Sequence, residues 1–255
     1  FCAEEELDAK RKEAEEKNED PKYDGTWRDA DPVEIEKKIN EGVPYTIRFK
    51  VPKDKVVSIN DRVRGKVSWD AGATLGDFII LRSNGMPVYN FCVSVDDSCM
   101  QITHVIRAEE HLTNTLRQML IMEALEYTPP TYAHCSLILG SDRSKLSKRH
   151  GATSLGQFSE QGFIPDAMMN YLANLGWNDG TDKEIYTPDE LIEAFDLDRI
   201  VKSAAIFDMV KLTWINKQHL SSMELEKLRP IVVDEMKKSS HNGPLVSDAT
   251  LESFK

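Results

Sequence analysis

The chain has 255 residues, 40% of them hydrophobic and 29% charged, which is enough apolar sequence for one large domain or about two to three small ones. A net charge of −11 is a poor signature for a protein whose whole surface binds nucleic acid, and no apolar run approaches the ~20 residues of a membrane helix. Residues 1–20 hold nine acids and four bases, net −5, whereas residues 44–66 hold seven bases and two acids, net +5. An RNA-binding surface, if there is one, should therefore be local.

The four cysteines, Cys2, Cys92, Cys99 and Cys135, are widely scattered, and no two of them form a C-x-x-C pair. This spacing supports neither a zinc site nor a disulfide framework, so we expect reduced thiols and no protein-bound zinc. The chain begins with Phe1 rather than Met. We therefore interpret it as a fragment whose start gives no information about targeting.

The first part of the chain predicts helices and then strands. Residues 1–20 predict a solvated helix that breaks at Asp20-Pro21, and Asp31-Pro32 begins a second helix that Gly42 can end. Residues 45–51 alternate between apolar and polar, which predicts a strand, and residues 56–59 predict another. Residues 62–67 continue this pattern.

The middle of the chain predicts an α/β unit. Two β-type runs, residues 77–82 and 88–93, flank Asn84-Gly85, a strong hairpin signal because both turn residues must take positive φ. A helix is expected after Val95-Asp96-Asp97. Residues 102–107 predict a buried strand, 112–125 a helix, and 135–139 a further strand. Such a strand–helix–strand unit is a parallel crossover, and ligands bind at the carboxyl ends of its strands, where Arg107 falls.

After Gly151 the pattern becomes helical. Pro165 opens one predicted helix, which stops at Gly176, and the sequence from Thr187 to Glu190 is a capping box that opens another. A third helix should cover about 208–216, and Ser221 with Glu224 is predicted to cap a fourth. Residues 239–255 are polar and predict no fold.

The sequence from Lys145 to Gly151, which reads Lys-Leu-Ser-Lys-Arg-His-Gly, follows the strand predicted at 135–139 and a turn at 140–143. Mobile lysines and backbone N–H groups beside a glycine suit a polyanion that must be held and then released. Taken alone, such a cluster is more often an ordinary solvated basic loop.

Other motifs in the sequence favour a phosphate-binding loop over a solvated one. Lys-Leu-Ser-Lys-Arg resembles the KMSKS-type signature of class I aminoacyl-tRNA synthetases. Val95-Asp96-Asp97 and the run from Ile102 to His111 resemble the glutamyl-tRNA synthetase family in its bacterial and organellar form. The resemblance extends from about Pro44 to His219, with several motifs in the order and spacing of the family.

The resemblance implies an α/β fold class: the second half of a Rossmann-like catalytic fold, an inserted α+β domain that binds the tRNA acceptor stem, and a following helical domain. We expect residues 1–75 to be part of the inserted domain, and 76–150 to be the Rossmann-like half with the basic loop. Residues 151–225 should form the helical stem-contact domain, and 226–255 the start of a truncated anticodon-binding region.

The same resemblance implies a glutamate pocket made by Tyr89, Val93 and Arg107. Arginine can fork onto a carboxylate with two parallel hydrogen bonds, which lysine cannot copy. The competing interpretations are a structural ion pair of Arg107 with Glu109 or Glu110 and an ordinary half-buried sheet tyrosine at Tyr89. Some members have Asn where this chain has Val93, so one polar contact of those relatives is in doubt.

For ATP, the resemblance implies contacts by a further set of residues: Glu110, Lys145, Leu146, Ser147, Lys148 and Arg149. Lys145 and Lys148 would act on the phosphates, with Lys148 most direct in the transition state, while Arg149 is also compatible with a structural role. The implied reaction is attack of the glutamate carboxylate on the α-phosphate of ATP, supplied with Mg²⁺, followed by transfer of the acyl group to the tRNA 3′ end.

The basic stretch around residues 44–66 would meet tRNA phosphates in a salt-sensitive contact. Its candidate side chains are Arg48, Lys50, Arg62, Arg64 and Lys66. Without the resemblance, a half-exposed sheet with ordinary solvated Lys and Arg is about equally compatible with this pattern.

One departure from the family is large, because the first half of the catalytic fold, with its HIGH signature, does not occur in this sequence. We therefore expect the chain alone to be inactive. A non-catalytic tRNA-binding or assembly module is the alternative function, and a glutaminyl-tRNA synthetase is a weaker one. The expected partners are tRNA(Glu), L-glutamate and ATP, with no membrane and a monomeric state. The expected compartment is a chloroplast or mitochondrion, or otherwise the bacterial cytoplasm.

Overall fold

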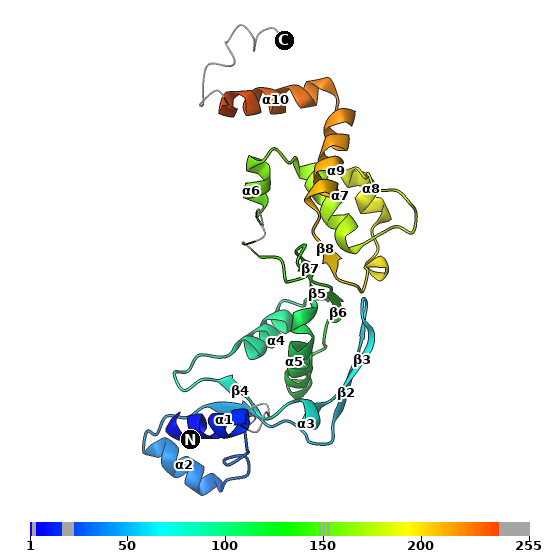
Figure 1. The fold of residues 1–255 in the computed structure, drawn as a ribbon. Coiled ribbons are helices and arrows are strands. Elements are labelled where there is room, and N and C mark those ends of the chain that lie inside the picture. The colour runs from blue at the N-terminus through cyan, green and yellow to red at the C-terminus, as the bar shows by residue number, and fades with distance from the viewer. Residues whose placement is uncertain (2–3, 17–22, 148, 150, 152–153, 240–255) are drawn as a thin grey trace. The chain divides into compact units, whose positions relative to one another are not determined.

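The structure is a computed structural model that describes residues 1, 4–16, 23–147, 149, 151 and 154–239 (Figure 1). The chain divides into two compact units, Phe1–His134 and Cys135–Lys255. The four domains predicted from the sequence are finer than this division, and they stay a prediction. In the described part of the chain, no helix is long and apolar enough to cross a membrane.

The first unit combines short antiparallel pairs with helices. Its elements are α1 (Glu4–Glu16), α2 (Pro32–Asn40), β1 (Ile47–Phe49), β2 (Val56–Asp61), β3 (Gly65–Asp70), α3 (Ala71–Thr74), β4 (Phe78–Leu81), α4 (Tyr89–Cys99), β5 (His104–Ala108), the 3₁₀ helix η1 (Glu109–His111), α5 (Leu112–Ala124) and β6 (Thr131–Cys135). β1 pairs with β4 and β2 with β3, both antiparallel, and β5 pairs with β6.

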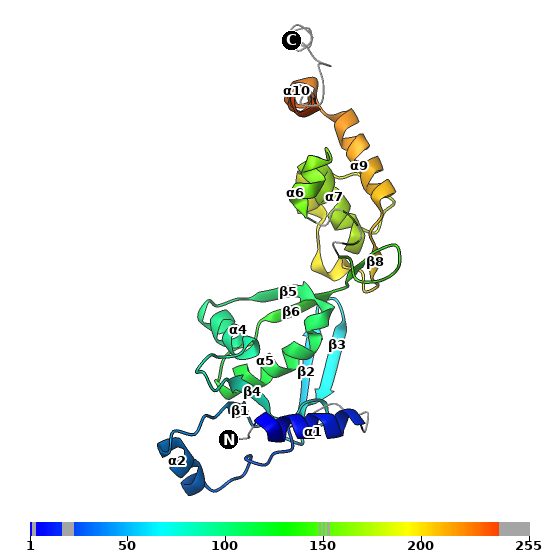
Figure 2. The same cartoon turned by 60° about the vertical axis from the view of Figure 1, so that its left-hand side comes forward.

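The β2–β3 hairpin packs against α5, as both ribbon views show (Figures 1 and 2). Residues along β2 alternate between exposed and buried, so that Val57, Ile59 and Asp61 share the inner face. Val57 lies in one apolar cluster with Leu116 and Leu120 of α5. Full burial of such a side chain stabilises the fold by roughly 1.5–3 kcal/mol. The same alternation turns the Asp61 carboxylate inward at the end of the strand.

Two predictions for this unit are wrong. The Asn84-Gly85 turn exists, with Gly85 at φ +77°, but residues 88–93 do not form a second strand beyond an isolated bridge from Leu81 to Pro87. Tyr89–Cys99 is a helix instead, and it already contains the Asp96-Asp97 pair after which a helix was expected.

The reason is tertiary. A short apolar run does not distinguish strand from helix, and one face of α4 is polar and buried. Ser94 is completely buried and donates to the Asn90 carbonyl at 2.7 Å, while the Asn90 side chain accepts from Gln118 of α5 at 3.1 Å. The Ser94 bond lies within α4, and the Asn90–Gln118 bond joins α4 to α5, so packing on α5 selects the helix.

The strands around residues 102–139 also differ in detail from the prediction. β5 is not buried on both faces, since Ile106 is 55% exposed. The strand predicted at 135–139 is split: β6 ends at Cys135, and β7 (Ile138–Leu139) pairs in parallel with β8 (Ala205–Ile206). Between them, the Ser136 hydroxyl donates to the carbonyls of Val201 and Lys202.

The second unit is mainly helical. Its remaining elements are α6 (Leu155–Glu160), α7 (Pro165–Gly176), α8 (Pro188–Ala194), the 3₁₀ helix η3 (Leu197–Arg199), α9 (Met209–Ser222) and α10 (Leu225–Ser239). Pro165 opens α7, and the capping box at Thr187 and Glu190 opens α8, as predicted. α9 is longer than predicted, so Ser221 lies inside it and caps no helix.

Candidate functional site

Arg107 lies near the end of β5, and its guanidinium is held by neutral groups. Its Nε donates to His134 Nε2 at 3.1 Å, and its Nη2 donates to Thr115 Oγ1 at 2.7 Å and to Gln118 Oε1 at 2.9 Å. The guanidinium also lies over the Tyr132 ring, 5.5 Å from its centroid. These partners come from α5 and β6, so the packing of helix on sheet fixes the side chain.

His134 connects Arg107 to a buried carboxylate. The side chains of His134 and Asp61 are both fully buried, and His134 Nδ1 lies 2.6 Å from Asp61 Oδ2. The Arg107 Nε–H can only donate, so His134 Nε2 must accept and the ring proton must sit on Nδ1, facing Asp61. The imidazole in this arrangement is neutral.

The electrostatics agree with a neutral ring beside an ionised acid. Burial lowers the pKa of His134; Asp61 opposes this effect, and Arg107 and Arg64 add to it. Burial would raise the pKa of Asp61, but hydrogen bonds from the backbone of Arg64, the His134 ring and the backbone of Val63 lower it overall.

This arrangement leaves one nitrogen of Arg107 for a ligand. Nε donates once and Nη2 donates both of its hydrogens, which leaves the two hydrogens of Nη1. Within the described residues, no carboxylate accepts a hydrogen bond from Arg107. Glu109, one of the two acids considered as its structural partner, instead pairs with Arg64 at 2.8 Å. A carboxylate arriving from solution would pair with this half-buried charge.

The other residues predicted for the glutamate pocket lie on the neighbouring helix α4. Tyr89 is at its first position and 54% exposed, with its ring centroid 6.2 Å from that of His111. Val93 is one turn further along and half-buried. Asn90 ties this helix to the Arg107 site, because it accepts from Gln118, which itself accepts from Arg107. Glu110 is exposed in η1, 4.0 Å from His111 Nε2.

The basic loop belongs to the second unit, and the structure describes its residues 145–147, 149 and 151. Lys145 is exposed and bridges back to Leu139, and the Leu146 N–H donates to the Ile138 carbonyl at 3.0 Å. Ser147 is half-buried, and Lys148 lies outside the described residues. Arg149 Nη2 donates to Ser144 Oγ at 2.7 Å. The loop therefore begins as a tight turn that presents Lys145 to solvent.

The candidate tRNA-binding side chains differ in their surroundings. Arg48 donates to the Asp77 carbonyl, Lys50 pairs with Asp29 at 2.8 Å, and Arg64 donates to the His134 carbonyl. Arg62 lies in the turn of the β2–β3 hairpin and Lys66 just after it, and both are exposed. The hairpin turn is thus the part of this set that is best placed for a phosphate.

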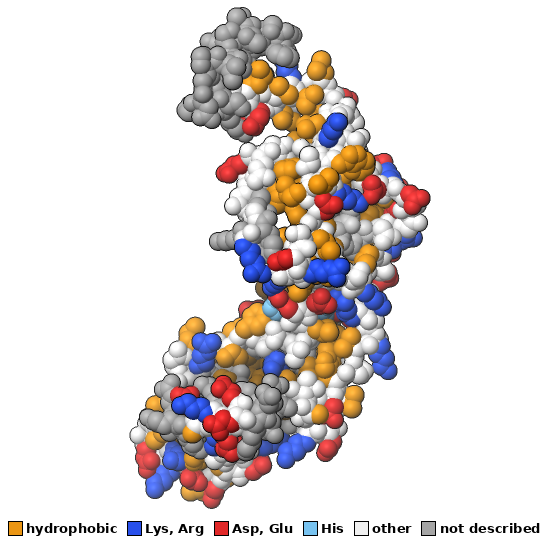
Figure 3. All heavy atoms as spheres, viewed as in Figure 1, with side chains coloured by type: hydrophobic (Ala, Val, Ile, Leu, Met, Phe, Trp, Pro, Cys, Tyr) orange, Lys and Arg blue, Asp and Glu red, His pale blue; other side chains and the backbone are white. Residues whose placement is uncertain are grey.

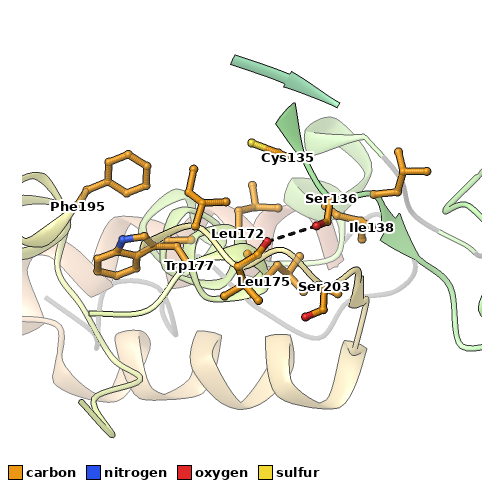
Figure 4. A pocket seen from close by; sticks show the side chains of 14 residues that line it. Cys135, Ser136, Ile138, Leu172, Leu175, Trp177, Phe195 and Ser203 are labelled. Carbon is orange, nitrogen blue, oxygen red and sulfur yellow. Dashed lines mark hydrogen bonds between the residues drawn. The ribbon is translucent and has the colours of Figure 1, made fainter. Parts of the chain in front are cut away.

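Unit two also contains an apolar cavity that the sequence did not predict (Figure 4). Its volume is about 230 Å³, and its walls include Leu172, Trp177 and Phe195. None of the described residues that line it is Lys, Arg, His, Asp or Glu, so we assign it no part in binding phosphate or carboxylate. Among the described residues there is also no group of three or more metal-binding side chains, and the expectation of no bound zinc stays a prediction.

The residues that sequence reasoning missed are those that hold Arg107: Asp61, Thr115, Gln118 and His134. They are separated from Arg107 by 8 to 46 positions and belong to no short motif. The only local signal is the acid at the buried end of an alternating strand, just before a turn.

A family model described as "tRNA synthetases class I (E and Q), catalytic domain" matches residues 1–214. The chain belongs to this family. The predicted fold class is confirmed by a crystal structure of a glutamate tRNA ligase from Elizabethkingia meningosepticum in complex with its amino acid, which matches 99% of the chain with a TM-score of 0.86 and 36% identity, over 55% of that protein. A glutamate-tRNA synthetase from Elizabethkingia anophelis matches equally well, with a TM-score of 0.86.

Curated class I relatives are closer in sequence. The chain is 52% identical to a glutamate–tRNA ligase of Carboxydothermus hydrogenoformans over 89% of its own length and 47% of the relative's. It is 51% identical to the corresponding ligase of Heliobacterium modesticaldum, again over 89% of this chain and 46% of the relative. The chain thus spans about half the length of the curated relatives it matches.

Proposed function

We propose that the polypeptide containing this chain ligates L-glutamate to tRNA(Glu), using ATP to form a glutamyl-adenylate. Two observations support this over a generic nucleotide-binding role. The family is that of the glutamate- and glutamine-specific class I synthetases, and the most similar curated relatives reported above are named glutamate–tRNA ligases.

The single observation that carries the proposal is the set of hydrogen bonds that fixes Arg107, which we call the Arg107 cage: those to His134, Thr115 and Gln118. A guanidinium that is fixed by three neutral acceptors, with Nη1 left over, is a prepared site for one carboxylate. Glutamate carries such a group on its side chain. With the side-chain end of the amino acid placed at Arg107, glutamine would present a neutral amide and leave the charge without a counter-ion, which favours glutamate.

The loop supports the ATP half of the reaction. Lys145 projects from a turn fixed by the Leu146–Ile138 and Arg149–Ser144 hydrogen bonds, which suits a cation that meets phosphate oxygens. ATP would arrive with Mg²⁺. The role of Lys148 rests on the sequence motif alone. Positioning and charge stabilisation are the main contributions of the protein.

The test uses the full-length natural polypeptide that contains this sequence, with ATP, tRNA(Glu) and labelled glutamate. We expect glutamate-dependent pyrophosphate exchange and labelled tRNA, and at least ~100-fold weaker use of glutamine, since a site built for a charged partner rejects its neutral analogue strongly. Absence of charging together with intact tRNA binding would contradict the proposal and support a non-catalytic binding module.

A further inference from the structure

Arg107 stands at one end of a buried polar chain that runs through His134 to Asp61. His134 Nδ1 meets Asp61 Oδ2 at 2.6 Å, and His134 Nε2 meets both Arg107 Nε at 3.1 Å and Thr115 Oγ1 at 3.0 Å. Asp61 is 3% exposed, and His134 and Thr115 are fully buried.

The Asp61 carboxylate is itself fixed by the backbone. Its Oδ1 accepts from the N–H groups of Val63 at 2.9 Å, Arg64 at 2.8 Å and His134 at 3.1 Å. The oxygen that remains, Oδ2, accepts from the His134 ring. A carboxylate held in this way accepts hydrogen bonds only, so it keeps the imidazole proton on Nδ1 and leaves the Nε2 lone pair for Arg107.

We propose that Asp61 and His134 are positioning residues for glutamate recognition: Asp61 selects the His134 tautomer, and His134 then holds the Arg107 guanidinium so that Nη1 is left for the substrate carboxylate. This inference rests on the proposed function. Neither residue touches the substrate. With the opposite tautomer, Nε2–H would face Arg107 Nε–H, and two donors would meet with no acceptor between them.

The decisive variant is Asp61→Asn. Its amide oxygen can still accept from the backbone N–H groups of Val63 and Arg64, so the hairpin turn keeps its hydrogen bonds. Its NH₂ group replaces Oδ2 and can only donate to His134 Nδ1, which moves the ring proton to Nε2. We expect a ~10–100-fold rise in KM for glutamate, the usual cost of a lost hydrogen bond to a charged group, and a KM for ATP within about twofold of wild type.

Two variants at His134 distinguish the Asp61–His134 contact from the His134–Arg107 contact. His134→Gln places an amide oxygen near the Nε2 position, so it can still accept from Arg107 without the help of Asp61. His134→Asn places its amide near Nδ1 and loses the acceptor. We therefore expect KM for glutamate to rise less in His134→Gln than in His134→Asn, whereas a purely structural role would let the two variants fail together.

His219→Gln is the control for burial. His219 is also buried and makes a neutral contact, with its Nε2 2.9 Å from Asn170 Oδ1, but it lies in the helical unit. We expect this variant to lower stability without a selective rise in KM for glutamate.

Kinetics are measured on the full-length polypeptide by glutamate-dependent pyrophosphate exchange, and the His134 tautomer by ¹⁵N NMR of the imidazole. The expected spectrum shows Nδ1–H in wild type and Nε2–H in Asp61→Asn. An active wild type with Nε2–H, or an Asp61→Asn variant with unchanged KM for glutamate or equal losses for glutamate and ATP, overturns this inference alone. An inactive wild type overturns the proposed function, and the positioning role with it.

Discussion

The Arg107 side chain is held by hydrogen bonds to neutral groups, and no carboxylate in the described part of the chain accepts a hydrogen bond from it. Its hydrogen bonds to His134, Thr115 and Gln118 compensate for lost water, yet none of these groups carries the negative charge that would neutralise it. Burial raises the pKa of the nearby Asp97, and Arg107 acts in the opposite direction. Because the three acceptors of the guanidinium are neutral, we expect Arg107 to attract the carboxylate of an incoming substrate.

Arg107→Lys tests the fork geometry directly. A single ammonium cannot serve His134, Thr115, Gln118 and a substrate carboxylate in the positions that the guanidinium occupies. We expect a ~10–100-fold rise in KM for glutamate. The control is Arg117→Lys on α5, whose guanidinium lies over Phe78 outside the Arg107 cage. Similar KM values for the two variants would show that Arg107 does not bind the substrate.

Lys148→Ala tests the loop. If Lys148 stabilises charge on the transferred phosphate, its loss should lower kcat ~10²–10³-fold, as for other preorganised donors. Lys183→Ala, at an exposed lysine paired with Glu190, is the control and should leave kcat unchanged. A loss below threefold for Lys148→Ala would remove this lysine from the mechanism.

At the scale of elements, caps and amphipathic faces were predictable, and polar packing was not. Pro32, Pro165 and the capping box at Thr187 act locally, and the structure confirms each of them. The first residues of α4 favour a strand by their sequence pattern, because the contact that joins this helix to α5 is made by Asn90 with Gln118, 28 positions away. In the same way, Arg107 could be chosen from a motif, but the His134–Asp61 chain behind it depends on tertiary contacts.

The short helix α3 depends on a close approach of the backbone. A Cβ at Gly72 would meet the Lys53 carbonyl oxygen, whereas one at Gly156 in α6 would meet nothing within 4 Å. We expect Gly72→Ala to lower the free energy of unfolding by ~1–3 kcal/mol. Gly156→Ala should raise it or leave it unchanged. Urea unfolding of both variants measures this, and equal midpoints would contradict the close approach.

At the scale of the whole molecule, the hydrophobic surface does not identify a partner. Figure 3 shows hydrophobic side chains around α7 and α9, where Val210 is 80% and Trp214 42% exposed. Charged and titratable groups lead to testable predictions. The buried histidines should make stability depend on pH, and the basic turn of the β2–β3 hairpin should make tRNA binding depend on salt.

Buried histidines predict lower stability in mild acid. Burial lowers the pKa of both His134 and His219 below the ordinary value of 6.5. The unfolded chain then binds more protons than the folded chain once the pH falls below about 6.5. The stabilisation is therefore complete above that pH and is lost as the pH falls toward the folded-state pKa values. Urea midpoints between pH 7.5 and 5.5 should fall in wild type and fall less in His134→Gln. A midpoint that does not change with pH would contradict neutral burial.

The net charge of −11 makes non-specific RNA binding unfavourable, so phosphate contacts must come from local cations such as those at the β2–β3 turn. We expect the double variant Arg62→Ala, Lys66→Ala to weaken tRNA binding and to reduce the slope of log K against log salt by about 2, or about 1 for each lost phosphate contact. Lys37→Ala on α2, where the lysine is also exposed, should leave the slope unchanged. An unchanged slope in the double variant would move the RNA contact away from this hairpin, because removing a cation that neutralises a phosphate must reduce the number of counterions released on binding.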